Sequence, residues 1–243
     1  MNGSIAVTLS ISPGRNLTWD VVNDLGGQIV RGDYAPGDMI PNEASLGKEF
    51  GVGRSAIREA VKMLTAKGLV DPRPKRGTAV LPLIHWNFLD ADVLSWALDG
   101  GPDRSFFIEL IQMRSAIEPE SAALAAERQN SNDIAAIRRA FERLKHADEN
   151  QLDLVSPDLE FHTAIVVASG NRFMRPLLTV HEAALKTSFR VTNAAFGQKF
   201  NLPAHEKILR AIERGRPELA RRSVRALLDA SHEVFKTGKK VGQ

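Results

Sequence analysis

A glycine turn that leads into a basic helix, close to the N-terminus, sets narrow limits on the fold. The turn, Gly51-Val52-Gly53, separates a short helix predicted over 43–50 from a longer one predicted over 54–67. The longer helix has apolar residues at helical spacing, which face a core, and basic residues four positions apart on another face. Two helices joined in this way, the second of them basic, predict a helix-turn-helix. The apolar residues are Ile57, Ala60, Val61 and Leu64, and the basic ones are Arg54, Arg58 and Lys62.

The flanking segments predict a winged form of this motif over residues 18–82. Before the turn, residues 18–31 carry apolar side chains at helical spacing, which adds a first helix. After it, Gly68 ends the third helix, and two short strands enclose a basic loop at 71–77. The residues before this domain, 1–17, are expected to form a flexible arm.

The positive charge of the chain is concentrated in this domain. The whole sequence has 32 Lys and Arg against 29 Asp and Glu, a net charge of only +3. Residues 54–76 hold seven basic and two acidic side chains, so this segment has a charge of +5 and the remainder −2. A basic face on a helix is by itself most often a solvated surface. Its place on the third helix, next to a basic wing, favours double-stranded DNA as the partner.

Residues of the third helix and of the wing are candidates for DNA contacts. Arginine on the first turns of a helix can pair with guanine O6 and N7 in the major groove. A helix N-terminus or a serine hydroxyl can donate to phosphate, and a glycine at the wing tip lets the backbone approach the minor-groove wall. The candidates are Arg54, Ser55, Arg58, Lys62, Lys75, Arg76 and Gly77.

Helical periodicity continues through the rest of the chain, without convincing strand alternation. A connecting helix is predicted from His85 to Leu98, inside a connector that we place at 83–101. Residues 102–243 predict an all-helical bundle, so the fold class is mainly α, a winged helix-turn-helix followed by a helical bundle. The helices of the bundle are expected at about 103–129, 132–151, 157–169, 172–192, 203–214 and 217–237.

Several classes of protein are excluded by what the sequence lacks. No apolar run approaches the roughly 20 residues that a membrane span needs, and the N-terminus does not have the pattern of a secretory signal. The chain has no cysteine, which excludes disulfides, thiolate metal sites and a cysteine nucleophile. We therefore expect a cytoplasmic protein that has no membrane partner.

Asp158 and His162 lie four residues apart on one predicted helix, so their side chains point in the same direction. His205, near the start of a later helix, would complete a set of oxygen and nitrogen ligands for a divalent metal. The alternative is an acidic residue near a helix N-terminus and a hydrogen-bonded histidine without any metal. For this spacing alone, the alternative without a metal is the one to prefer.

Residues 32–80 resemble the N-terminal domain of the GntR family of bacterial transcription regulators. The resemblance lies in the motifs PG-x3-P-x-E, R-x3-REA, GLV and RGTAV. Family members often have Ser or Thr at the position of Gly53 and Arg at that of Ala44, so a capping hydroxyl and a phosphate or base contact are missing here. The resemblance implies base and phosphate contacts for Arg54, Ser55 and Arg58, and a place at the wing tip for Arg76 and Gly77.

Most of residues 102–243 resemble the FCD domain, the effector-binding domain of the FadR-type branch of this family. The motifs that carry the resemblance are ELIQMRSAIEPESAALAAER, D-x2-FH, ASGNRFM and HEKILRAIERG. It implies an effector-binding and dimerisation domain, in which an Asp, a His four residues later and two further histidines commonly hold a divalent metal beneath a carboxylate effector. Asp158, His162 and His205 match three of these positions.

The fourth ligand position falls at Leu227. His232 is five residues further on, about 140° around the helix from the required face, and is a poor substitute. The resemblance therefore implies either one divalent metal, zinc or similar, with water in place of the fourth ligand, or a site without metal.

The same resemblance implies that Arg114 reaches the carboxylate of the effector, since guanidinium and carboxylate pair bidentately. Arg190, Thr192 and Asn193 are further candidates for effector contacts, through hydroxyl recognition. The connector segment 86–98 resembles that of galactonate-responsive regulators in this branch, which also lack the last histidine. A sugar acid such as galactonate is the effector that this similarity suggests.

The sequence thus predicts a homodimeric transcription regulator, a repressor, that a small carboxylate releases from a palindromic operator. One alternative keeps the regulator but changes its effector to another small organic acid or to an acyl thioester. A second alternative is a metal-dependent enzyme fused to a DNA-binding module, because Asp and His sets also serve hydrolysis. No general base or nucleophile motif supports the second alternative, so we do not expect an enzyme.

Overall fold

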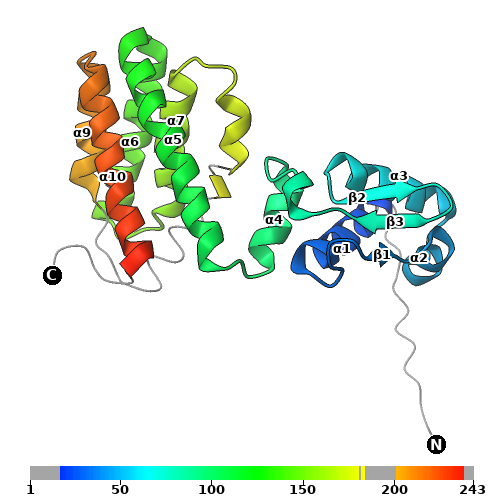
Figure 1. Ribbon diagram of the computed structural model, residues 1–243. Helices are drawn as coiled ribbons and strands as arrows, with labels where there is room; N and C mark the ends of the chain where they lie inside the picture. The colour runs from blue at the N-terminus through cyan, green and yellow to red at the C-terminus, as the bar shows by residue number, and fades with distance from the viewer. Residues whose placement is uncertain (1–16, 181, 184–200, 238–243) are drawn as a thin grey trace, which may run out of the picture. The chain divides into compact units, whose positions relative to one another are not determined.

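Three helices and a small sheet make up most of the described part of the N-terminal unit of the chain. The computed structural model describes residues 17–180, 182–183 and 201–237, and its internal contacts divide the chain into two units after Gly100. The three strands are antiparallel, in the order β1-β3-β2 (Figure 1). The elements are α1 (Leu17–Arg31), β1 (Met39–Ile40), α2 (Glu43–Phe50), α3 (Arg54–Ala66), β2 (Val70–Arg73) and β3 (Gly77–Val80).

Local signals in the sequence account for the turn between α2 and α3. The side chain of Asn42 caps α2 by accepting hydrogen bonds from two backbone N–H groups of its first turn. Gly51 ends α2 in the left-handed region, at φ 66°. Gly53 precedes α3 and gives it no side-chain cap, as expected from the missing hydroxyl. Together with the wing formed by β2 and β3, this arrangement confirms the winged helix-turn-helix.

The core of this unit is built from the apolar faces of its helices and from the strand ends. Its residues are almost fully buried. Helices α1 and α3 contribute side chains at the predicted three- and four-residue spacing, and α2 contributes Leu46. The exposed faces of α2 and α3 keep the charged side chains. The largest of its fully buried side chains are Leu25, Ile29, Leu46, Ile57, Leu64 and Leu69.

The predicted connecting helix from His85 to Leu98 is wrong in its first half. The chain instead forms a single 3-10 turn, η1 (Leu83–His85), and then helix α4 (Ala91–Asp99). The reason is Asp90, whose carboxylate accepts hydrogen bonds from the N–H groups of the next turn and so starts a new helix there.

Helix α4 is part of the N-terminal unit. The Nζ atom of Lys67, which follows α3, lies 2.7 Å from Asp90 Oδ1 and 2.6 Å from Asp92 Oδ2. Trp96 of α4 packs on α1 so closely that a Cβ atom on Gly26 would lie 2.5 Å from its ring. The ion pairs therefore fix α4 to the end of α3, and the ring contact fixes it to α1.

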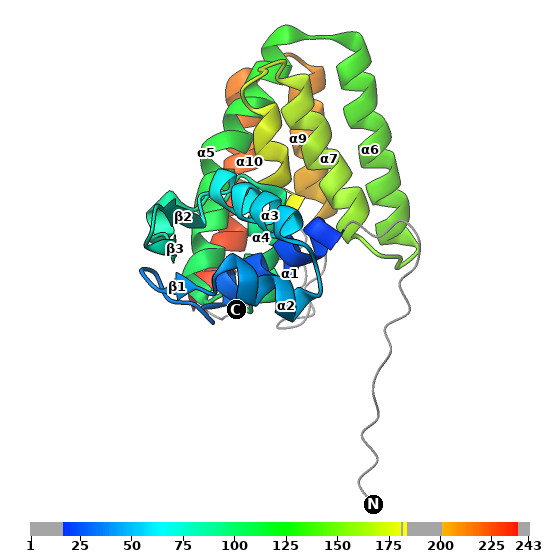
Figure 2. The same cartoon turned by 90° about the vertical axis from the view of Figure 1, so that its right-hand side faces the viewer.

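Among the residues that the structure describes, five long helices form the C-terminal unit. Helix α10 packs along α5, α7 packs along α6, and α9 contacts α5, α6 and α10 (Figures 1 and 2). Their core includes Phe141, Phe161, Ile165, Ile208 and Val224. This arrangement confirms the predicted helical bundle. The elements are α5 (Arg104–Arg128), α6 (Ser131–Glu149), α7 (Val155–Ala168), η2 (Arg175–Leu177), α9 (Leu202–Glu213) and α10 (Pro217–Thr237).

The helix predicted over 172–192 does not start at residue 172. Residues 172–174 form a turn, in which the side chain of Asn171 accepts a hydrogen bond from the N–H of Phe173, and the 3-10 turn η2 follows. Among the helices that the structure describes, none is long and apolar enough to cross a membrane.

Candidate DNA interface and metal centre

The seven candidate DNA contacts all lie on the surface of the N-terminal unit. Arg54, Ser55, Arg58 and Lys62 are exposed on α3, where the turn after α2 places them, and Lys75, Arg76 and Gly77 are exposed at the tip of the wing. The structure thus brings the predicted residues to two exposed elements, a helix and a hairpin, of one unit.

The tip of the wing depends on two residues with positive φ. Lys75 has a φ of 61° and Gly77 a φ of 94°, and the N–H of Arg76 donates to the carbonyl oxygen of Arg73 at 3.0 Å. A Cβ atom at position 77 would lie 2.7 Å from Cε of Met39. The positive φ favours glycine at this position, whereas the flexible end of the Met39 side chain could move away from a Cβ atom.

Arg58 has a partner that the sequence analysis did not predict. Its Nε donates to both carboxylate oxygens of Glu43, at 3.1 and 2.9 Å. Farther along α3, Lys62 donates to Glu59 at 3.3 Å. The link between Glu43 and Arg58 joins the first residue of α2 to the middle of α3.

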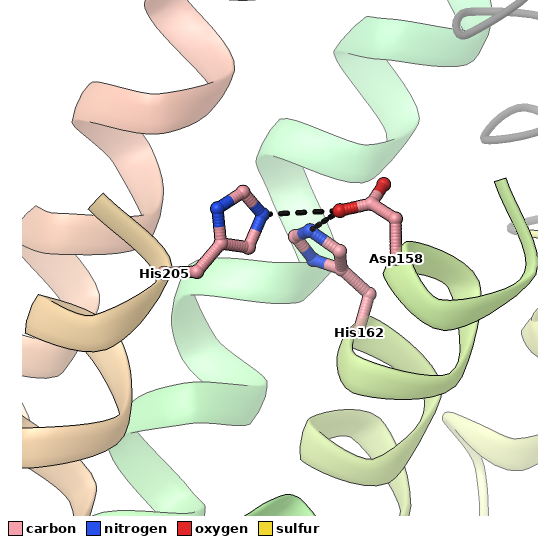
Figure 3. A group of neighbouring side chains, drawn as sticks. All are labelled: Asp158, His162 and His205. Carbon is pink, nitrogen blue, oxygen red and sulfur yellow. Dashed lines mark ion pairs between the residues drawn. The ribbon is translucent and has the colours of Figure 1, made fainter. Parts of the chain in front are cut away.

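The structure brings Asp158, His162 and His205 together inside the C-terminal unit (Figure 3). Asp158 and His162 come from α7, and His205 comes from α9. Asp158 Oδ1 lies 3.1 Å from Nε2 of His205 and 3.6 Å from Nε2 of His162. One ligand atom from each residue lies within 4.8 Å of the others, and all three residues are buried. This geometry is compatible with a single metal ion.

Each imidazole ring is fixed through its other nitrogen. Nδ1 of His162 lies 2.7 Å from Glu118 Oε2, and Nδ1 of His205 lies 2.9 Å from the backbone oxygen of Asn201. Phe161, fully buried, contacts both rings edge to face. Carboxylate or carbonyl partners of this kind orient histidine ligands and leave Nε2 directed at the metal position.

Glu118 is a functional residue that the sequence analysis missed. Its Oε1 accepts a hydrogen bond of 2.5 Å from Nε of Arg114, one turn earlier on α5, and both side chains are buried. Glu118 therefore connects Arg114 to His162. The only signal in the sequence was the four-residue spacing from Arg114, which puts the two side chains on one helix face. We call Arg114, Glu118, Asp158, His162 and His205 the buried cluster.

Burial and neighbouring charges set the ionisation of this cluster. Burial lowers the pKa of His162 below its ordinary value, although Glu118 and Asp158 favour the protonated ring. A neutral ring is the form that binds metals. Burial alone would raise the pKa of Asp158, but its interactions with His162, His205 and Arg114 outweigh burial and hold this pKa below its ordinary value.

The remaining candidates are not part of this arrangement. Leu227 is partly buried and packs against the apolar core of the unit, and its side chain offers no ligand atom. Arg190, Thr192, Asn193 and the side chain of His232 lie outside the part of the chain that the structure describes.

Two family models match the chain. Residues 17–80 match the bacterial regulatory proteins of the gntR family, and residues 109–230 match the FCD domain. Both are domains of transcription regulators, not of enzymes.

Two relatives from Escherichia coli (strain K12) are similar over most of the chain. The HTH-type transcriptional regulator YieP is 32% identical over 88% of this chain and 93% of its own length. The galactonate operon transcriptional repressor is 31% identical over 91% of this chain and 97% of its own length.

The fold is also similar to solved structures. The Listeria monocytogenes regulator Lar matches with a TM-score of 0.61 and 17% identity, over 92% of this chain and 98% of that one. A GntR protein from Streptococcus agalactiae matches with a TM-score of 0.50 and 24% identity, over 89% of this chain and 99% of that one. The two domain matches and the two relatives from Escherichia coli show the family. The chain belongs to the GntR family of DNA-binding transcription regulators and carries an FCD effector-binding domain.

Proposed function

We propose that this protein is a cytoplasmic, homodimeric repressor that leaves a palindromic operator when a small sugar acid, such as galactonate, binds its FCD domain. The observation that carries the proposal is the buried cluster. In it, the carboxylate of Glu118 contacts both Arg114 and His162, a residue of the candidate metal site. The similarity to the galactonate operon repressor supports the choice of a sugar acid.

DNA binding is assigned to α3 and the wing. We propose that Arg54, Ser55 and Arg58 contact bases and phosphates, that Lys62 contacts the backbone, and that Lys75, Arg76 and Gly77 contact the minor-groove side. These assignments are supported by the position of all seven residues, which are exposed on the surface of the N-terminal unit. Two copies of this unit in a dimer would contact two half-sites related by two-fold symmetry.

Asp158, His162 and His205 would hold one divalent ion, zinc or similar. Their donors, one carboxylate oxygen and two imidazole nitrogens, suit such an ion and leave coordination positions open. When bound, the ion supplies positive charge and open positions for an anionic ligand. The rings of His162 and His205 need no rearrangement to bind it, because Glu118 and the Asn201 carbonyl already orient them.

The charge of the buried cluster supports both a cation and an acidic effector. Within the five residues of the buried cluster, with the histidines in the neutral form that metal binding requires, the carboxylates of Asp158 and Glu118 and the guanidinium of Arg114 give a formal charge of −1. Buried charge is costly unless it is compensated. A divalent ion changes the net charge to +1, and one effector carboxylate then neutralises it.

Arg114 would bind that carboxylate. Its hydrogen bond to Glu118 uses Nε, and a guanidinium has four further N–H donors, enough for a bidentate contact with a second carboxylate. Arg190, Thr192 and Asn193 stay candidates for contacts with the hydroxyl groups of the sugar acid.

Isothermal titration of the chelator-stripped protein tests this assignment. We expect one Zn²⁺ per chain, and galactonate binding that is tighter with the metal than without it. His205→Asn should weaken Zn²⁺ binding at least about tenfold, since loss of even a supporting residue has an effect of this size.

His146→Asn is the matched control, because His146 is an exposed histidine of the same unit, and its metal binding should be unchanged. If the wild-type protein binds no stoichiometric metal, the metal assignment is wrong. If it binds metal but none of the sugar acids, the effector assignment is wrong.

A further inference from the structure

Glu43 puts a negative charge next to an arginine that we assign to DNA. Its carboxylate accepts two hydrogen bonds from Nε of Arg58 and so joins α2 to α3. The side chain of Glu43 is 43% exposed and that of Arg58 is 66% exposed. An ion pair this exposed contributes little to stability. Fold stability therefore gives no sufficient reason for a carboxylate at this position.

The geometry of the pair restricts the direction of the arginine. A guanidinium is planar, so a carboxylate held at Nε also determines where the edge with the two Nη groups points. The backbone of Glu43 is itself fixed, because it is the first residue of α2 and follows the Asn42 cap. The two hydrogen bonds at Nε leave the Nη edge of Arg58 for other acceptors.

The neighbours of Arg58 on α3 make such a restraint useful. Arg54 and Lys62 lie one turn before and one turn after it, and like charges at this spacing repel one another. The carboxylate of Glu43 offsets this repulsion at the middle position. A flexible arginine between two cations would lose more side-chain entropy on binding a base than one already held in place.

We propose that Glu43 is a positioning residue for DNA recognition, which holds Arg58 so that its Nη edge can pair with a guanine in the major groove. The inference rests on the proposed role of α3 as the recognition helix. Simple electrostatics predicts the opposite effect, because a carboxylate near phosphates weakens DNA binding. The two explanations therefore differ in the sign of the effect when the charge of Glu43 is removed.

The test compares Glu43→Gln with Glu59→Gln. Glu59 is also exposed, and its partner is Lys62 on the same helix, so both variants remove one negative charge next to a basic residue of α3. The probes are a duplex selected by the wild-type protein from a random-sequence pool and a scrambled duplex of the same composition. Fluorescence anisotropy at several salt concentrations gives both affinities, and thermal unfolding checks that each variant is folded.

We expect Glu43→Gln to bind the selected duplex about tenfold more weakly, near the lower end of what a bidentate arginine–guanine contact contributes. Its affinity for the scrambled duplex should be unchanged or higher. Glu59→Gln should bind both duplexes as tightly as the wild type or more tightly. In an Arg58→Lys background, Glu43→Gln should cause no further loss of selectivity, because lysine has no Nη edge to position.

Equal or tighter binding of the selected duplex by Glu43→Gln would overturn the inference. An equal loss on both duplexes would overturn it too, since that loss would not involve base recognition. If the wild-type protein selects no sequence from the pool, the proposed role of α3 fails, and the inference fails with it.

Discussion

Arg58→Ala is expected to abolish sequence-selective DNA binding while the protein stays folded. Arg58 is exposed at the middle of α3, and its replacement would remove the proposed bidentate base contact, worth roughly 1–3 kcal/mol in each half-site. Two half-sites in a dimer make this about 2–6 kcal/mol. The loss of Arg58 also leaves the carboxylate of Glu43 facing the DNA without its partner.

Anisotropy with a selected duplex measures this loss, and thermal unfolding measures the stability. Arg138→Ala is the control. Arg138 is an exposed arginine of α6 and is paired with Glu213, and both residues belong to the C-terminal unit. The control should bind DNA like the wild type. Wild-type affinity in Arg58→Ala would mean that α3 does not contact the bases as we propose.

Arg114→Ala is expected to destabilise the C-terminal unit strongly. Arg114 and Glu118 are both nearly inaccessible to solvent, with side chains 5% and 2% exposed. Removal of the guanidinium takes away the buried ion pair of Glu118 with Arg114, and breaking a buried pair in this way costs about 3–5 kcal/mol. A lost effector response in this variant would therefore also reflect unfolding. Arg114→Lys keeps the positive charge and should separate effector binding from stability.

Urea denaturation of the full-length chain gives the stability change. Arg143→Ala is the control, because the pair of Arg143 with Glu160 is about half exposed and its loss should cost no more than about 1 kcal/mol. An Arg114→Ala protein as stable as the control would show that Glu118 does not depend on Arg114 for its charge.

Much of the N-terminal unit could be predicted from the sequence because its signals are local. Asn42, Gly51 and Gly68 mark the ends of helices, and the apolar spacing of α3 shows its buried face. The break before α4 was missed because the apolar spacing of the connector continues across it, and the Asp90 cap overrides that spacing.

The candidate metal centre could be predicted only in part. Asp158 and His162 share one helix, so their spacing indicates their proximity. His205 was added from its residue type and its place near the start of a later helix, and family resemblance then matched all three residues to ligand positions. The partners Glu118 and Asn201 come from segments that packing brings together, α5 and the start of α9. Helical periodicity predicts on which side of its helix a residue lies. It does not predict which other helix packs against that side. The contact of Glu43 with Arg58 was missed for the same reason.

Release of DNA by an acid is the most direct test of the proposed regulator. Fluorescence anisotropy of a duplex from the promoter region of the protein's own operon would be followed during titration with galactonate, gluconate, lactate and citrate, with and without a chelator. We predict that the protein binds the duplex, that galactonate or a related sugar acid releases it, and that the chelator weakens this release without preventing DNA binding. DNA binding that none of the acids changes would contradict the account.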